Sequence, residues 1–219
     1  KKINVNLVGV GAGLSYDVSG PTHHCLEDIT IMRALPNIEV FSPSDWVLTE
    51  KFIDYSIKVK KPKYLRFDGK PLPGIYEHTL PVKIEDGFHE FKKGSKICFV
   101  STGIMTHKAL NVQSMLSEQN VNAGVIDVFL LKQVNVDALY EAFKKYEALV
   151  VLEEAFINKG GLDSLILGIL NSKGSKIKVK NMGFGDSYVF DIGSRSYLHK
   201  LNKLDEESII ENAKWLLKQ

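Results

Sequence analysis

Residues 96–152, KICFVSTGIMTHKALNVQSMLSEQNVNAGVIDVFLLKQVNVDALYEAFKKYEALVVL, decide the fold of this chain. Three apolar runs stand out in this stretch, at 96–101, 123–130 and 148–152. Between them, apolar residues recur about every 3.6 positions, at 106–118 and 135–146. Apolar strands that alternate with amphipathic helices are typical of a mostly parallel sheet covered by helices on both faces.

The same alternation extends toward both ends of the chain. Toward the C-terminus it predicts a helix, a strand and a closing helix, at 162–171, 176–182 and 205–218. Toward the N-terminus it predicts a strand, a helix, a strand, a helix and a strand, at 3–10, 27–35, 38–41, 45–58 and 64–67.

Between these two halves the pattern breaks. From residue 69 to residue 93 the chain holds three of its seven prolines, among glycines and charged residues. Such a stretch is typical of a linker or of an extended segment that crosses between domains. We therefore predict two domains, at residues 1–70 and 93–219, joined by a linker at 71–92.

The first of these domains is small for a parallel sheet. Three strands and two helices leave apolar surface uncovered, because each face of a parallel sheet needs its own layer of helices. We therefore expect residues 1–70 to be the latter part of a larger domain. Its remainder would lie upstream in the same chain or in a partner chain.

Composition and charge exclude several classes of protein. Hydrophobic residues are 44% and charged residues 25% of the chain, as in globular proteins rather than disordered or fibrous ones. The net charge of +2 predicts no nucleic-acid partner. The apolar runs fall far short of the ~20 residues that span a bilayer, so we expect no membrane partner. Two cysteines and no leader-like apolar segment lead us to expect a cytoplasmic protein.

The glycines after the first strand do not complete a dinucleotide-binding motif. Gly9 and Gly11 fit the first part of G-x-G-x-x-G, but the pattern then needs glycine where the chain has Leu14. Such glycines are also typical of a loop whose backbone adopts φ values that other residues avoid.

The next segment, Ser19-Gly20-Pro21-Thr22-His23-His24, carries the candidate functional residues. A stiff Gly-Pro turn comes directly before the paired histidines. Adjacent histidine side chains diverge, so we expect no metal shared between them. Two interpretations stay open from the residues alone: surface histidines, or one histidine that donates a hydrogen bond or relays a proton near neutral pH.

Motifs along essentially the whole chain resemble one enzyme family. In order, they are Gly20-Pro21-Thr22-His23-His24, Glu27-Asp28-Ile29, Met32-Arg33-Ala34-Leu35-Pro36-Asn37, Phe41-Ser42-Pro43-Ser44-Asp45, Val150-Val151-Leu152-Glu153-Glu154, Gly160-Gly161 and Gly193-Ser194. They resemble transketolases and deoxyxylulose-phosphate synthases. The run Gly11-Ala12-Gly13-Leu14-Ser15-Tyr16 is closest to the C-terminal subunit of two-subunit transketolase-like proteins.

The resemblance implies an α/β fold: a partial pyrimidine-binding domain, followed by a transketolase C-terminal domain with a mainly parallel sheet. It implies a transferase that passes a two-carbon ketol unit between sugars or sugar phosphates, with thiamine diphosphate and Mg²⁺ as cofactors. The family's catalytic Glu belongs to a motif upstream of the first strand, and its diphosphate-binding domain has no counterpart here. We therefore expect the cofactor to be shared with an upstream segment or a diphosphate-binding subunit, in a homo- or heterodimer, and this chain alone to be inactive.

The resemblance also carries over three residues. His23 matches a histidine that contacts the donor sugar, and it is the expected catalytic residue. Ser19, His23 and Arg66 are the expected substrate-binding residues. Ser19 stands where the family has an Asp, and Gly11 and Ala12 stand where it has a His or Arg near the sugar phosphate. The resemblance assigns no cofactor contact or metal ligand to a residue of this chain, and from the residues alone Arg66 could equally be a strand-end surface charge.

Other functions and roles stay open. The chain could belong to a deoxyxylulose-phosphate synthase-like enzyme, or serve only in dimerisation and assembly. A beta subunit of a 2-oxo acid dehydrogenase shares the architecture, but its loop differs from G-P-T-H-H. Glu153 and Glu154 are adjacent on a strand and face opposite sides, which favours structural or interface roles. Four scattered histidines are interpreted as surface or structural: His78, His89, His107 and His199.

Overall fold

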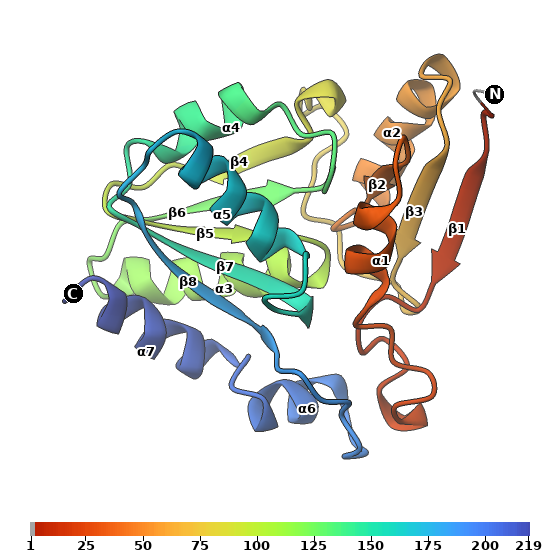
Figure 1. Cartoon of the computed structure of the whole chain (residues 1–219). Coiled ribbons are helices and arrows are strands. Elements are labelled where there is room, and N and C mark those ends of the chain that lie inside the picture. Colours follow the sequence, from red (N-terminus) through yellow and green to blue (C-terminus); the bar gives the residue numbers. More distant parts are fainter. Residues whose placement is uncertain (1–2) are drawn as a thin grey trace.

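The computed structural model describes residues 3–219, which form two α/β units (Figure 1). The first unit is built on a three-stranded parallel sheet with the strand order β1-β3-β2. Its elements are β1 (Asn6–Val10), the 3-10 helix η1 (Asp17–Ser19), α1 (Asp28–Ala34), β2 (Glu39–Phe41), α2 (Trp46–Lys58) and β3 (Lys63–Phe67).

The second unit is built on a five-stranded sheet with the order β4-β6-β5-β7-β8. All neighbouring strands run parallel except β4 and β6, which confirms the prediction of a mainly parallel sheet. Its elements are the 3-10 helix η2 (Ile84–Asp86), β4 (Phe88–Lys92), β5 (Ile97–Ser101), α3 (Ile104–Glu118), β6 (Ala123–Val128), α4 (Val136–Phe143), β7 (Ala148–Phe156), α5 (Leu162–Ser172), β8 (Lys178–Phe184), α6 (Arg195–Leu201) and α7 (Glu206–Leu216).

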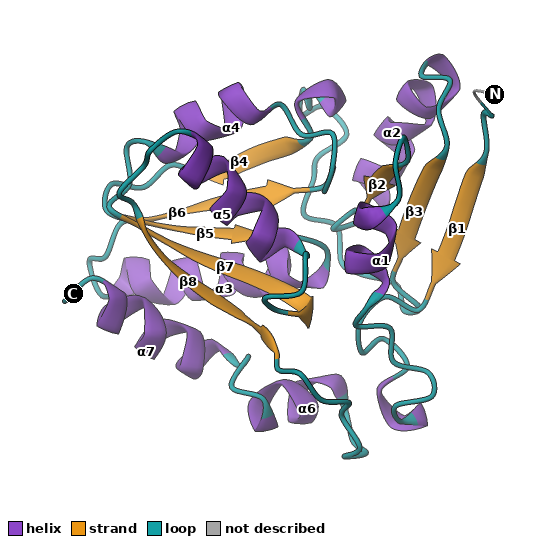
Figure 2. Ribbon diagram, in the orientation of Figure 1, coloured by secondary structure: helices purple, strands orange, loops and turns teal. Residues whose placement is uncertain are grey.

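Helices cover both faces of the second sheet (Figure 2). On β5, Ile97 and Phe99 join an apolar cluster with α3 and α7, whereas Cys98 and Val100 join a cluster with α4 and α5. Successive side chains of a strand point to opposite faces, so a strand that is apolar at every position can be buried on both. This is why β5 is a continuous apolar run.

One strand and one α-helix, β4 and α6, were not predicted from the sequence, and neither were the 3-10 helices η1 and η2. β4 lies inside the stretch 71–92 and forms the antiparallel edge of the second sheet, with mostly half-buried and partly charged side chains. α6 is only seven residues long and begins after Ser194, whose Oγ accepts a hydrogen bond from the backbone N–H of Tyr197. Short elements show too few apolar repeats for their period to be recognised. The domain boundaries at 70 and 93 stay a prediction.

A buried polar network joins the two units at Asp127, near the end of β6. Its carboxylate accepts hydrogen bonds from Ser44 Oγ of the first unit, from Tyr76 of the connecting segment and from Thr106 of α3, each at 2.8 Å. Burial raises the pKa of Asp127 to about 7, although the three hydroxyl donors act in the opposite direction. Beside the network, Phe41 and Phe129 belong to an apolar cluster that spans both units.

Strand β1 is an edge strand with apolar side chains exposed on both faces of the first sheet. Leu7 is 46% and Val8 is 57% exposed, and these neighbours point to opposite faces. Strands of parallel sheets are ordinarily buried on both faces. The uncovered apolar surface expected from the sequence is therefore present in this structure. Among residues 3–219, no helix combines the length and the apolar character needed to cross a bilayer.

We expect Asp127→Asn to change how stability depends on pH. The folded-state pKa of about 7 lies above the ordinary value of 3.8, so the contribution of the protonated carboxyl is complete below about pH 4 and is lost as the pH rises to about 7. Between about pH 5.5 and about pH 8, the wild type should lose about 2 kcal/mol of unfolding free energy relative to the variant.

Urea unfolding at the two pH values measures this difference. The matched control is Asp186→Asn, which removes the carboxylate of an exposed side chain. A difference between wild type and Asp127→Asn that stays constant with pH would contradict a raised pKa at Asp127.

Candidate functional site

The loop between β1 and α1 carries most of the residues that the sequence singled out. It leaves the first sheet at the carboxyl end of β1 and passes beside α6 (Figure 1). In open α/β sheets, ligands bind at the carboxyl ends of the strands. Residues 11–25 are called the site loop below.

Gly13 brings the site loop against Glu154 of β7. The backbone of Gly13 has a φ of +57°, and a Cβ at this position would lie 1.9 Å from Oε2 of Glu154. The N–H of Leu14 donates to the same Oε2 at 3.0 Å. Glycine is therefore required at position 13 for two reasons, its backbone conformation and the close approach of the carboxylate.

Glu154 is buried and binds two side chains of α6. Arg195 Nε donates to Oε1 at 2.8 Å, Arg195 Nη2 donates to Oε2, and His199 Nε2 lies 2.5 Å from Oε1. Burial raises the pKa of this carboxyl, but the hydrogen bonds and charges of Arg195 and His199 outweigh burial and hold the pKa well below its ordinary value. Glu154 is therefore ionised at neutral pH.

Arg195 extends this contact to the first unit. Its Nη1 lies 2.7 Å from Oδ2 of Asp68, which follows β3, and its backbone N–H donates to Oδ2 of Asp17 at 2.9 Å. Lys70 Nζ donates to the same Asp17 oxygen at 2.7 Å. Burial raises the pKa of Asp17, but Lys70 and the backbone donors outweigh burial and lower it. The start of α6 thus binds both the site loop and the segment after β3.

Ser19 and His23 lie in the site loop with exposed side chains. Ser19 is the last residue of η1. His23 Nδ1 lies 3.0 Å from Thr22 Oγ1, and its ring meets the ring of Tyr16 edge-on, with 6.3 Å between their centroids. Both predicted residues are therefore accessible, and their contacts with substrate stay predictions.

The sequence left open whether Arg66 is a surface charge, and the structure shows that it is not. It is buried at the end of β3, and its Nε donates to the two carboxylate oxygens of Asp28 at 2.8 and 3.1 Å. Its Nη2 donates to the carbonyl oxygens of Cys25 and Glu154, at 3.3 and 3.2 Å. These contacts join the end of the site loop to β3 and β7, and a contact between Arg66 and substrate stays a prediction.

The two histidines of the site loop have different surroundings. The interpretation of both as surface residues is wrong for His24, which is 9% exposed and whose Nε2 lies 3.2 Å from the carbonyl oxygen of Asp17. His199 is also buried, and its Nε2 contacts the Glu154 carboxylate. The chain turns inward after His23 because Cys25 pairs its backbone with Gly13.

The structure supports a structural role for both acidic residues of β7. Glu154 binds the site loop and α6, as described above. Glu153 caps the start of α5, where the N–H groups of Leu162 and Asp163 donate to its carboxylate at 2.8 and 2.9 Å. Burial raises the pKa of Glu153 to about 8, although these N–H donors lower it.

Sequence reasoning did not assign roles to Asp17 and Arg195. They are 178 residues apart in the chain, so no local spacing could connect them. The sequence offered one hint, the Gly193-Ser194 motif of the family resemblance, which directly precedes Arg195.

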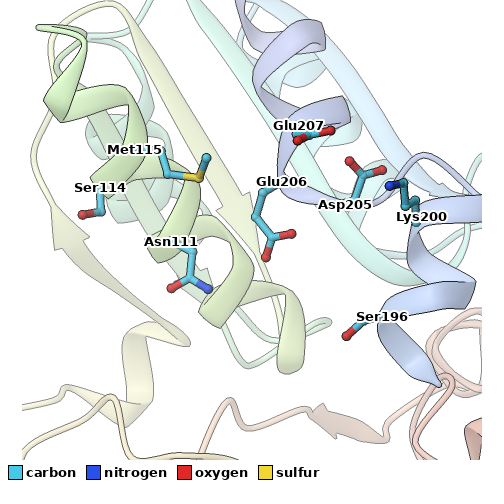
Figure 3. A pocket seen from close by; sticks show the side chains of 8 residues that line it. All are labelled: Asn111, Ser114, Met115, Ser196, Lys200, Asp205, Glu206 and Glu207. Carbon is cyan, nitrogen blue, oxygen red and sulfur yellow. The ribbon is translucent and has the colours of Figure 1, made fainter.

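Several hollows lie outside the site loop itself, and two of them adjoin residues that contact the loop or belong to α6. A small cavity of about 150 Å³ adjoins Asp68 and Lys70, between the end of β3 and the start of α2. A larger open groove of about 680 Å³ lies on the second unit, where side chains of α3, α6 and the start of α7 face one another (Figure 3). Among residues 3–219, no group of three or more His, Cys, Asp or Glu side chains is arranged to hold a metal ion.

Two family models match this chain. The pyrimidine-binding domain of transketolase matches residues 1–73, and the C-terminal domain of transketolase matches residues 89–209. Together they span most of the chain, in the order that the sequence motifs predicted.

Individual proteins of known name are also similar. One of the subunits of an apulose-4-phosphate transketolase, from Actinobacillus succinogenes, is 32% identical over 96% of this chain and 67% of its own length. A putative transketolase C-terminal section of Methanocaldococcus jannaschii is 30% identical, over 95% of this chain and 65% of its own. A solved structure described as a split gene transketolase, an inactive beta4 tetramer, is 28% identical with a TM-score of 0.87, over 99% of this chain and 68% of its own. The chain thus spans about two thirds of the length of these relatives.

We expect Glu154→Gln to lower the free energy of unfolding by about 3 kcal/mol at pH 7, because it leaves the Arg195 guanidinium without one of its two carboxylate partners. The pKa of Glu154 is lowered, so the ionised carboxylate stabilises the fold above the ordinary pKa of 4.5, and this contribution is lost as the pH falls. The difference in unfolding free energy between variant and wild type should therefore narrow by about 1.4 kcal/mol per pH unit below pH 4.5.

Urea unfolding at pH 7 and at pH 3.5 measures both effects. The control is Glu50→Gln, which removes an exposed carboxylate that pairs with exposed His78. Equal, small effects of the two glutamines would show that the buried ion pair contributes little to stability.

We expect His24→Ala and His23→Ala to differ in stability. His24→Ala removes a buried ring and its contact with Asp17, so the free energy of unfolding should fall by about 1–3 kcal/mol. His23→Ala removes an exposed ring and should change it by no more than about 0.5 kcal/mol. Thermal melts of the two variants make the comparison, and equal melting temperatures would contradict the burial of His24.

Proposed function

This chain belongs to the transketolase family, and on that premise we propose that it is the C-terminal part or subunit of a thiamine diphosphate-dependent enzyme. The enzyme transfers a two-carbon ketol unit between sugars or sugar phosphates. The observation that carries the proposal is the site loop, because the family's G-P-T-H motif lies at the carboxyl end of a parallel strand with His23 exposed. We further propose that the protein works in the cytoplasm.

Ser19 and His23 are the proposed contacts of this chain with the donor sugar. Both side chains are accessible, and both carry groups that exchange hydrogen bonds with sugar hydroxyls. The imidazole of His23 can also act as a general acid or base. Thr22 Oγ1, 3.0 Å from Nδ1, bonds one ring nitrogen and leaves Nε2 for the substrate.

Arg66 is proposed to act indirectly. Its guanidinium is bound by Asp28 and by two backbone carbonyl oxygens, so it holds the end of the site loop in place. A substrate oxygen would have to compete with a buried carboxylate for the same donors. The contacts of Arg66 therefore favour a positioning role over the direct substrate contact predicted from the sequence.

Thiamine diphosphate, when bound, supplies the nucleophile that takes up the two-carbon unit. We propose that its diphosphate and Mg²⁺ are held by residues outside this chain. The relative from Actinobacillus succinogenes is named as one subunit of a transketolase, which supports a second, diphosphate-binding polypeptide for this chain as well. The apolar side chains of β1, exposed on both faces of the first sheet, support a partner that covers them. The assembly is then a homo- or heterodimer, or a larger multiple of it.

We expect the purified 219-residue chain to give no ketol transfer with thiamine diphosphate and Mg²⁺ alone. Adding the diphosphate-binding polypeptide encoded in the same genome should restore transfer, with hydroxypyruvate as donor and glycolaldehyde as acceptor. In that complex, His23→Ala should lower kcat/KM by ~100-fold, the typical cost of losing a transition-state hydrogen bond or a proton relay.

His78→Ala is the matched control, because it removes another exposed histidine, one that contacts Glu50 and Trp46 on α2. Equal, small effects of the two alanine substitutions on kcat/KM would show that His23 has no part in the site. A complex that forms but transfers no ketol unit would favour the alternative role, in which the chain serves only in assembly. Activity with pyruvate and glyceraldehyde 3-phosphate as substrates would favour the deoxyxylulose-phosphate synthase-like alternative.

A further inference from the structure

Asp17 is the most firmly held residue of the site loop, although neither the chemistry proposed above nor the sequence motifs give it a role. It is only 6% exposed. Its Oδ2 accepts from Lys70 Nζ at 2.7 Å and from the Arg195 N–H at 2.9 Å, and its Oδ1 accepts from the Val18 N–H at 2.9 Å. These donors come from three separate segments of the chain, including the first residue of α6.

Asp17 is also held through its backbone. Its carbonyl oxygen lies 3.2 Å from Nε2 of His24, a buried ring on the far side of the same loop. Asp17 and His24 thus contact each other although they lie seven residues apart in the sequence. The loop between them carries the exposed residues Ser19 and His23.

Backbone hydrogen bonds close a tight turn at each of the two exposed residues. The Ser19 N–H donates to the carbonyl oxygen of Tyr16 at 2.9 Å, and the His23 N–H donates to that of Gly20 at 3.0 Å. Ser19 lies two residues after Asp17, and His23 lies directly before His24. A rotation or shift of Asp17 would therefore move both side chains.

We propose that Asp17 is a positioning residue that sets where Ser19 and His23 point, by tying the site loop to Lys70 and to the first residue of α6. The inference rests on the proposed function only in its claim that Ser19 and His23 contact a substrate. Its claim about their position rests on the contacts of Asp17. It gives the second unit a part in the site, because Arg195 belongs to α6 and is itself held by Glu154. A unit that only supported association would not need this contact.

Asp17→Asn tests the proposal, because it keeps the size of the side chain and removes its charge. The control is Asp186→Asn, which removes the same charge from a side chain that is 82% exposed and is bound by Lys159 Nζ, at 2.9 Å. The first readout is the imidazole NMR signal of His23 in the full 219-residue chain, identified by its loss in His23→Gln. It is recorded well below the melting temperature of each variant.

We expect the His23 and His24 signals to shift or broaden in Asp17→Asn and to stay unchanged in Asp186→Asn. Lys70→Met is the second variant, in case Asp17→Asn does not fold. The Lys70 side chain is half exposed, and its loss leaves the Arg195 N–H on Asp17, so a smaller shift in the same signals is expected. A lowered melting temperature with unchanged signals, in whichever of the two variants folds, would overturn the proposal and leave Asp17 a purely structural residue.

The second readout is ketol transfer by the complex with the diphosphate-binding polypeptide. Misplacing a group that orients the substrate by about 1 Å can cost ~100-fold in rate, so we expect Asp17→Asn to lower kcat/KM at least ~10-fold, with a raised KM for hydroxypyruvate. Unchanged kinetics would overturn the proposal even if the signals shift. Shifted signals in a chain whose wild-type complex transfers no ketol unit would support the geometry and overturn the proposed function instead.

Discussion

The buried carboxylate of Glu154 is the contact on which the arrangement of the two units depends. An ionised carboxylate that lacks partners in a protein interior costs several kcal/mol, so its surroundings must supply donors from every side. β7 contributes the charge, α6 contributes Arg195 and His199, and the site loop contributes the N–H of Leu14. Gly13 has no side chain because a Cβ there would collide with the same carboxylate.

The contact at Glu154 also bears on which of the two sheets can bind a ligand at the carboxyl ends of its strands. An α/β sheet ordinarily offers its ligand site at the carboxyl ends of its strands. In the second unit that edge is covered by the first unit, through Ser44 on Asp127 and through Leu14 on Glu154. In the first unit the corresponding edge carries the site loop, whose tip is exposed. The second unit therefore acts on the site through the residues that hold the loop.

The charges near the site loop are paired, and the pair of Arg195 with Asp68 crosses between the two units. Arg66 binds Asp28, Lys70 binds Asp17, and Arg195 lies between Glu154 and Asp68. Such pairs contribute geometry as well as energy, because the planar guanidinium groups bond in fixed directions. The candidate contacts with the donor sugar, Ser19 and His23, are by contrast exposed. The residues that hold the site loop are thus ionic and mostly buried, whereas the accessible residues can exchange hydrogen bonds with a sugar.

The sequence by itself determined the parallel sheet of the second unit, the order of the family's domains and the place of the G-P-T-H loop after a strand. These follow from local patterns: the apolar run of β5, the helical repeats beside it, and motifs a few residues long. Only the tertiary structure decided that β4 belongs to the sheet, that His24 is buried beside exposed His23, and that Arg66 is bound by Asp28. It alone connected Asp17 with Arg195 and Glu154. The physical reason is that burial and ion pairing depend on segments far apart in the chain, which meet only when the chain folds, whereas periodicity and turn chemistry act over a few neighbouring residues.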